Sequence, residues 1–224
     1  MCAHYESTHD KARLQQHFGI DLPNELARRD VWPGYLSTFL RRHPHADVGD
    51  EAVPPREGLL GSFGLIPSWS KDTKIARHTY NARSETVASK PSFRDAWHRA
   101  QHCIVPIDAF FEPDWRSGKA VPTRIHLASG EPMGAAGLWA AWKDDQGTVL
   151  HSFTLLTINA DTHPLMNQMH KPADEKRMIV ILPPERYDDW LQASAQVSAD
   201  FLRPIAADQL VAQTPTPAQS SLGL

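Results

Sequence analysis

Residues 134–158 read GAAGLWAAWKDDQGTVLHSFTLLTI, and this stretch holds two apolar runs, 134–142 and 151–158, on either side of a polar segment. Both runs have the length and composition of strands. Five further runs of this kind lie elsewhere in the chain, at residues 34–40, 58–66, 103–107, 123–128 and 177–182. This order lacks the strand–helix alternation of a Rossmann sheet. We therefore predict a single β-rich α+β domain, with a mostly antiparallel, barrel-like sheet and a few short flanking helices.

Short helices are predicted beside these strands. A first helix is expected at residues 9–18, because Ser7-Thr8 precedes it as a cap and Gly19 follows it. The other predicted helices cover residues 91–100, 162–169 and 184–192. The helix at 91–100 opens with a capping-box pattern, Ser92 to Asp95, and the one at 184–192 opens with paired prolines.

The chain is organised as one unit, since it shows no internal repeat and no convincing linker. The domain is expected to span residues 1–212, with a loop at residues 21–34. The tail at residues 213–224 is polar and rich in Pro and Ser, and we expect it to be disordered.

The composition is that of an ordinary globular protein, with 224 residues, 41% of them hydrophobic and 22% charged. No run approaches the ~18 apolar residues that span a bilayer, and the N-terminal segment lacks the apolar core of a signal peptide. Two cysteines, Cys2 and Cys103, cannot make a disulfide framework. We expect a cytoplasmic monomer that makes no membrane contact and needs no cofactor.

The charge is nearly balanced, with 23 Lys and Arg against 26 Asp and Glu. A global positive field is therefore excluded as a way to bind nucleic acid, and any such contact needs a local groove. The segment 71–103 is a candidate, because it carries seven basic residues, including Arg77 and Lys90, and three acidic ones. Taken alone, this segment is more typical of a solvated surface.

Established nucleotide-binding and hydrolase motifs are absent: there is no Walker loop and no GxGxxG, GxSxG or HExxH sequence. His98, His102 and Cys103 have a spacing that suggests a metal. They lack a second ligand pair, and Cys103 opens an apolar strand where a small buried thiol is common. We predict no metal site.

Cys2 offers a distinctive chemistry, because a small second residue permits removal of Met1 and would leave Cys2 at the N-terminus. An α-amine of pKa ~7.7–8.0 would then lie beside a thiol of pKa ~8.5. Such a 1,2-aminothiol condenses with an aldehyde to give a thiazolidine. Alternatively, the thiol attacks an amide, as in N-terminal-nucleophile hydrolases.

Three other segments carry polar groups suited to catalysis. NARSET (81–86) combines an amide, a guanidinium and a carboxylate in a short run. Glu112 follows two aromatic residues at the end of an apolar strand, a setting that raises the pKa of a carboxyl group and suits acid–base work. His170 lies in a polar loop that leads into an apolar strand.

Together these segments resemble the SOS-response-associated peptidase family, also called abasic site processing proteins. The resemblance covers most of the chain in the family's order: MCAHY (1–5), GLIPSW (64–69), NARSETVASKPSFRDAW (81–97), HCIVPIDAFFE (102–112), GLWAAW (137–142), FTLLTINAD (153–161) and His170 followed by KRMIVIL (176–182). It implies an enzyme that binds single-stranded DNA and crosslinks the ring-opened aldehyde of an abasic site as a stable thiazolidine, which protects the lesion. The family's other proposed activity is autoproteolytic removal of Met1.

The resemblance also implies roles for single residues. Cys2 would be the nucleophile, Asn81 would position it, Glu112 would transfer protons in crosslinking, reversal or lyase chemistry, and His170 would assist opening of the sugar ring. DNA contacts are expected from Arg83 on a phosphate, from Trp69 as a stacking wedge, from Thr157 in the pocket, and from Arg77 and Lys90 in the basic segment. On DNA the protein would be associated with the nucleoid.

Several positions depart from the family pattern. Ala3 and His4 replace a glycine and a cation beside Cys2, and Phe63 replaces a tryptophan. The usual DGFYEW is DAFFEP (108–113) here, so a tyrosine hydroxyl near Glu112 is lost, and the linker KPADEK (171–176) is longer than usual. Two other functions stay open: a cysteine peptidase or amidase that acts on peptides in trans, and a non-enzymatic single-strand binder.

Overall fold

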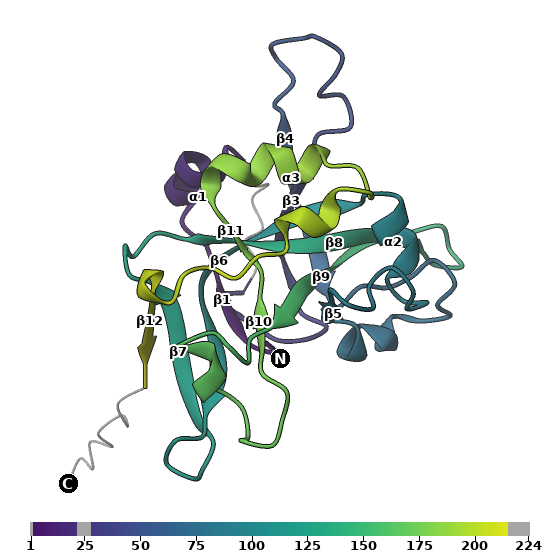
Figure 1. Cartoon of the computed structure of the whole chain (residues 1–224). Coiled ribbons are helices and arrows are strands. Elements are labelled where there is room, and N and C mark those ends of the chain that lie inside the picture. Colours follow the sequence, from purple (N-terminus) through teal and green to yellow (C-terminus); the bar gives the residue numbers. More distant parts are fainter. Residues whose placement is uncertain (1, 22–27, 215–224) are drawn as a thin grey trace, which may run out of the picture.

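Twelve strands form one sheet in the computed structural model, which describes residues 2–21 and 28–214 (Figure 1). The strands are β1 Tyr5–Ser7, β2 Asp30–Val31, β3 Leu36–Arg42, β4 Arg56–Phe63, β5 Asn81–Arg83, β6 His102–Asp114, β7 Val121–Leu127, β8 Met133–Lys143, β9 Val149–Asn159, β10 Arg177–Ile179, β11 Ile181–Leu182 and β12 Leu210–Gln213. The helices are α1 Lys11–Phe18, α2 Arg94–His98 and α3 Tyr187–Gln192, with short 3-10 turns η1 Thr73–His78, η2 Met166–Gln168, η3 Pro184–Arg186, η4 Ser198–Phe201 and η5 Ala207–Gln209.

Five of the strands close into a barrel in the order β8, β9, β4, β3 and β6, because β6 pairs again with β8. All of these neighbours are antiparallel except β4 and β9, which run parallel. Three buried aromatic rings fill part of the interior: Phe63 and Phe39 lie 5.7 and 5.6 Å from Phe153 between ring centroids. The predicted β-rich α+β domain with a barrel-like sheet is confirmed.

All seven predicted strands are present, although the run at residues 177–182 divides into β10 and β11. The sequence did not predict β1, β2, β5 or β12, each of two to four residues. β2 lies inside the predicted loop at 21–34. From residue 215 onward the predicted tail lies outside the described residues, so its disorder stays a prediction.

The helices differ from the predictions mainly at their ends. Asp10, rather than Ser7-Thr8, caps α1 by accepting a hydrogen bond from the Arg13 amide at 3.0 Å, because Ser7 is already part of β1. Gly19 ends this helix in the left-handed conformation, as expected. The expected capping box at Ser92 does not form, since α2 begins only at Arg94, and the helix predicted at 162–169 is reduced to η2.

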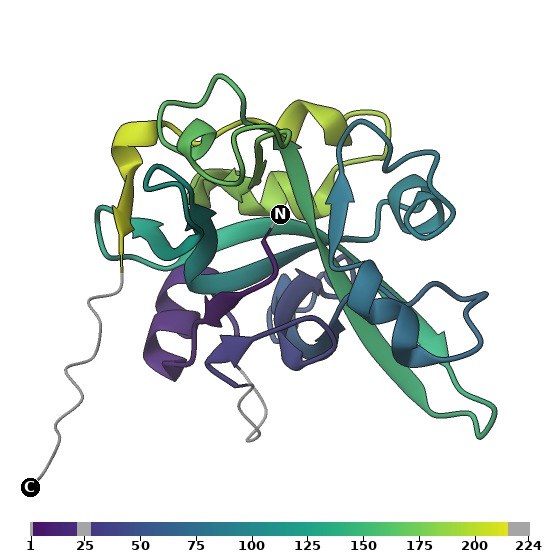
Figure 2. The ribbon, with the colours of Figure 1, turned by 90° about the horizontal axis from the view of Figure 1, so that it is seen from below.

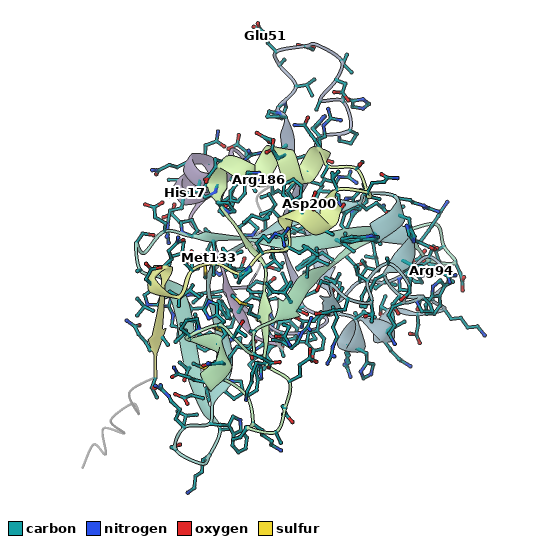
Figure 3. All side chains as sticks on the ribbon, in the orientation of Figure 1. His17, Glu51, Arg94, Met133, Arg186 and Asp200 are labelled. Carbon is teal, nitrogen blue, oxygen red and sulfur yellow. The ribbon has the colours of Figure 1, made fainter. Side chains whose placement is uncertain are left out.

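The elements around the barrel are arranged on opposite sides of it. α1 and α3 lie above β6 and β8 in Figure 1, whereas β1, β5 and β10 lie below them, and Figure 2 shows the molecule from this lower side. The loop between β3 and β4 projects above the body, with Glu51 at its tip (Figure 3). Within residues 2–21 and 28–214, no helix has the length and apolar content required to cross a bilayer.

Gly64, directly after β4, is required by a close backbone approach. Its φ is +122°, and a Cβ at this position would lie 1.9 Å from the carbonyl oxygen of Ala76. The Gly64 amide donates to the Phe153 carbonyl at 2.8 Å, so the backbone cannot move away without breaking contact with β9. Gly118 is a natural comparison, because its φ is +78° but no atom lies within 4 Å of the Cβ position.

We expect Gly64→Ala to lower the free energy of unfolding by about 3–4 kcal/mol, because it adds a backbone clash to the strain of a positive φ. Gly118→Ala should lose about 1 kcal/mol, from the strain alone. Urea unfolding followed by tryptophan fluorescence measures both variants. Equal losses would contradict the proposed role of the Ala76 contact.

Candidate active site

Cys2 lies next to the second half of β6. β1 pairs antiparallel with β6 through Tyr5 and Phe110, and the Phe111 amide donates to the His4 carbonyl at 3.0 Å. This pairing sets the residues before Tyr5 alongside those after Phe110. The Cys2 side chain is 1% exposed, and its Sγ lies 3.5 Å from the His4 carbonyl oxygen. Burial raises the pKa of the Cys2 thiol, and the nearby Glu112 charge raises it further.

Asn81 fixes the backbone of Cys2 from the other side. β5 runs parallel to β9, with Asn81 opposite Leu155, and this places the amide side chain within reach of the N-terminal segment. Asn81 Nδ2 donates to the Cys2 carbonyl oxygen at 2.7 Å. The second polar atom of this amide, Oδ1, is buried and accepts no hydrogen bond from the part of the chain that the structure describes.

Glu112 and His170 form a buried acid–base pair. Glu112 is 2% exposed, and burial raises its pKa to about 7. His170 Nε2 lies 3.3 Å from Glu112 Oε2, and burial lowers the pKa of this imidazole to about 4. Both shifts have the same cause, because a buried site disfavours the charged form of either group. At neutral pH the imidazole is therefore neutral.

His170 has a strained backbone. Its φ is +64°, a conformation that non-glycine residues rarely adopt and that costs about 1–3 kcal/mol. The His170 amide donates to the Pro113 carbonyl at 2.7 Å, one residue beyond Glu112. This contact ties the loop before β10 to the end of β6 and holds the imidazole against the carboxyl group.

The four residues predicted to carry the chemistry thus lie in one cluster, although they are far apart in sequence. A family model described as SOS response associated peptidase (SRAP) matches residues 1–217. The chain belongs to the SRAP family.

Several known proteins are similar to this SRAP chain. Abasic site processing protein YoqW of Bacillus subtilis is 36% identical over 154 residues, which cover 67% of this chain and 65% of YoqW. Abasic site processing protein HMCES of Rattus norvegicus is 26% identical, over 76% of this chain and 54% of HMCES. A crystal structure of a protein from Bordetella bronchiseptica has a TM-score of 0.86 and 45% identity, and the match covers 96% of this chain and all of that one.

The predicted phosphate contact Arg83 lies on the surface of this SRAP domain but is ion-paired. Arg83 Nη1 lies 2.8 Å from Glu175 Oε2, and Glu175 also accepts from the buried Arg177. Arg177 in turn holds Glu85, the carboxylate of NARSET, through both guanidinium nitrogens at 2.8 and 2.9 Å. The sequence singled out NARSET but not Glu175 or Arg177, because their pairing joins segments about 90 residues apart.

Thr157 is buried beneath this network. Its hydroxyl accepts from Arg177 Nη2 at 3.2 Å and lies 3.5 Å from the Ala82 carbonyl oxygen. It therefore holds β5, β9 and β10 together in the structure, and its expected position in a DNA pocket stays a prediction.

The remaining predicted DNA contacts are exposed and lie between β4 and α2. Trp69 is 54% exposed, and its Nε1 donates to the Pro91 carbonyl at 3.2 Å, next to Lys90. Trp69 and Lys90 therefore share one surface. Arg77 lines a separate small cavity of about 200 Å³ together with Tyr35 and Lys74.

The two histidines with suggestive metal spacing bond elsewhere, and Cys103 is a buried free thiol. His98 Nε2 lies 3.0 Å from the Ala88 carbonyl oxygen, and His102 Nε2 lies 2.8 Å from the Ser198 hydroxyl. Across residues 2–21 and 28–214, no three His, Cys, Asp or Glu side chains gather to hold a metal ion.

Two departures from the SRAP pattern lie in contact with each other. The His4 ring stacks on Phe111, which stands where the family has tyrosine, with centroids 4.2 Å apart and planes 9° apart. The opposite face of His4 stacks on Trp32 with the same spacing and angle, and His4 Nε2 lies 3.0 Å from Asp30 Oδ1. Positions 4 and 111 are remote in sequence, and no local signal indicates that their rings stack.

Glu112 should make the stability of the domain depend on pH. Its pKa is about 7 in the folded chain against an ordinary value of 4.5, so the folded state retains a proton that the unfolded state has lost between these values. The free energy of unfolding therefore falls as the pH rises through this window. We expect the free energy of unfolding of wild type, minus that of Glu112→Gln, to fall by about 3 kcal/mol from pH 4.5 to pH 8.

Urea unfolding at pH 4.5, 6 and 8 measures this difference. Glu185→Gln makes the same change on the exposed surface and serves as the control, for which a flat difference is expected. A flat difference for Glu112→Gln would show that the carboxyl group titrates in the ordinary range.

Proposed function

We propose that this chain processes abasic sites in single-stranded DNA by forming a covalent thiazolidine through Cys2, and so protects the lesion from strand scission. The observation that carries the proposal is the cluster of Cys2, Asn81, Glu112 and His170, linked by the contacts of Asn81 to Cys2 and of His170 to Glu112. The names of YoqW and HMCES, abasic site processing proteins, support the substrate class.

The proposed chemistry starts with hydrolysis of the Met1–Cys2 peptide bond, which consumes one water and releases methionine. The exposed α-amine of Cys2 then attacks the aldehyde of the ring-opened deoxyribose, and loss of water leaves an imine. The thiol adds across the C=N bond, with sulfur bonding to carbon and a proton moving to nitrogen. The thiazolidine carbon has no C=O or C=N bond, so the neighbouring C–H is no longer acidified and elimination of the 3′ phosphate is suppressed. Removal of Met1 proceeds either by self-cleavage or by an aminopeptidase.

The neighbouring side chains match the proton transfers of this scheme. Glu112, with a pKa of about 7, exchanges protons readily near neutral pH with the amine, the departing water and the thiol. Neutral His170 would assist opening of the sugar ring, by accepting or donating a proton at Nε2. Asn81 Nδ2 holds the Cys2 carbonyl, and its buried Oδ1 would accept a hydrogen bond from the freed amine.

The burial of Cys2 disfavours a peptidase that acts in trans. A cysteine peptidase requires a thiolate, generally stabilised by a nearby cation. Burial and the Glu112 charge both raise the pKa of the Cys2 thiol instead. Imine formation begins with the amine, and the thiol needs to lose its proton only as the ring closes.

Recognition of the strand is proposed to rely on exposed aromatic and basic side chains. Trp69 would stack where the strand is distorted, and Arg83, Arg77 and Lys90 would contact phosphates. Thr157 would line the pocket. We further propose that the protein acts as a monomer in the cytoplasm, associated with the nucleoid when it is bound to DNA.

The first test mixes the protein, after its N-terminus has been checked by intact mass, with single-stranded DNA that carries one abasic site. Wild type should give a band that survives heat and denaturant, and undamaged DNA should give none. Cys2→Ala should abolish the band and leave non-covalent affinity within about twofold, because it removes only the nucleophilic sulfur. Absence of the band with a free N-terminal Cys2 would overturn the proposal, and peptide turnover blocked by a thiol reagent would then favour the hydrolase.

Glu175 should weaken phosphate capture by competing for Arg83. Its carboxylate lies 2.8 Å from the guanidinium on exposed surface, where an ion pair contributes about 0.2–1 kcal/mol. We expect Glu175→Gln to raise affinity for single-stranded DNA by about 1.5- to 5-fold, and Arg83→Gln to lower affinity and its salt dependence.

Fluorescence anisotropy at several salt concentrations measures both effects. Glu185→Gln removes the same charge from another part of the surface and separates a local effect from a change in net charge. Equal gains for Glu175→Gln and Glu185→Gln would contradict a specific competition at Arg83.

A further inference from the structure

Three rings form a continuous stack beside Cys2. Phe111 on β6, His4 before β1 and Trp32 after β2 lie with successive centroids 4.2 Å apart and with planes inclined by only 9°. The contact between His4 and Asp30 at 3.0 Å fixes the edge of the middle ring. The stack therefore runs outward from the second half of β6 and ends in an indole.

The outer end of this stack is open. Trp32 is 45% exposed, and because His4 covers one face of its ring, the other face is the accessible one. The loop that carries it is anchored: the Tyr35 amide donates to the Trp32 carbonyl at 2.9 Å, and the Gly34 amide donates to the Phe63 carbonyl at 2.6 Å. A rigid, half-exposed aromatic face is a preformed stacking surface, because little conformational freedom remains to be lost on binding.

Basic side chains lie on the Tyr35 side of Trp32, whereas Asp30 lies on the His4 side. The Arg28 guanidinium lies 5.0 Å from the centroid of the Tyr35 ring, and the cavity beyond Tyr35 is lined by Lys74 and Arg77. Among the residues that the structure describes, neither Arg28 nor Arg77 has an acidic partner within ion-pair distance. An aromatic face next to cations that have no acidic partner among the described residues matches a ligand with a flat base on an anionic backbone.

We propose that Trp32 is a stacking platform for a nucleobase next to the abasic sugar at Cys2, with His4 as the positioning residue that holds the indole plane. This inference rests on the proposed function and deepens it by assigning the contact to a flanking base. The link to Cys2 is short, since His4 is two residues away and its carbonyl oxygen lies 3.5 Å from Cys2 Sγ. His4 thus contacts the nucleophilic residue with its backbone and the platform with its ring.

The test measures binding to a single strand with one tetrahydrofuran residue, an abasic analogue that has no aldehyde and cannot crosslink. We expect the Trp32→Ala variant to bind this strand about 5- to 100-fold more weakly than wild type, because it loses base stacking. Trp32→Leu keeps an apolar side chain on His4 and should lose nearly as much, whereas Trp32→Phe should lose less. Thermal melting confirms that each variant is folded.

A second strand series separates stacking from other effects. Replacing the base on one side of the tetrahydrofuran by a second tetrahydrofuran should weaken wild-type binding by a factor similar to that for Trp32→Ala. The same replacement should leave binding by Trp32→Ala unchanged, because the variant has already lost that contact. The affinity of His4→Ala for the strand should lie between those of wild type and Trp32→Ala.

The proposal is overturned if Trp32→Ala binds within twofold of wild type. It is also overturned if Trp32→Ala loses affinity equally on strands with and without each flanking base. Neither readout depends on covalent chemistry, so failure of the crosslinking test would leave this result interpretable.

Discussion

The structure depends on the continuity of β6. Its first half, from His102 to Ile107, pairs with β8 and closes the barrel, and its second half pairs with β7 and β1. The same strand therefore carries the core at one end and Glu112 at the other. Because β1 pairs along β6, with Glu6 also held by Arg124 on β7, the position of Cys2 follows from the register of β6. A shift of one residue would turn Glu112 away from the cluster.

Burial then sets the chemistry of the cluster. Removing Glu112, His170 and Cys2 from water favours the neutral form of each, so the three groups hold protons differently from their counterparts in solution. A carboxyl group with a pKa of about 7 beside a neutral imidazole gives up or takes a proton at little cost near neutral pH. The strained backbone of His170 shows that the fold tolerates a local cost to keep this contact. Acid–base capacity is therefore a consequence of the burial of these side chains in the fold.

The sequence predicted the seven main strands because each is a long apolar run that carries its own signal. It missed β1, β2 and β5, because two or three residues contain no periodicity and depend on distant partners for their pairing. For the site, the family resemblance predicted the four clustered residues. It did not predict Glu175 and Arg177, because their role depends on ion pairs between segments that are remote in sequence. Local rules also failed at Ser92, where tertiary packing delayed the start of α2.

The stack of Phe111, His4 and Trp32 shows why substitutions beside the nucleophile are best considered together. Considered separately, His4 replaces a cation of the family pattern and Phe111 replaces a tyrosine, with loss of its hydroxyl group. In the fold they touch, and a planar ring at position 4 fits between two aromatic faces at 4.2 Å on either side. The flat imidazole fills the space between the two rings and still reaches Asp30. The two substitutions therefore form one packing unit, which fixes the backbone next to Cys2 through the hydrogen bond from the Phe111 amide to the His4 carbonyl.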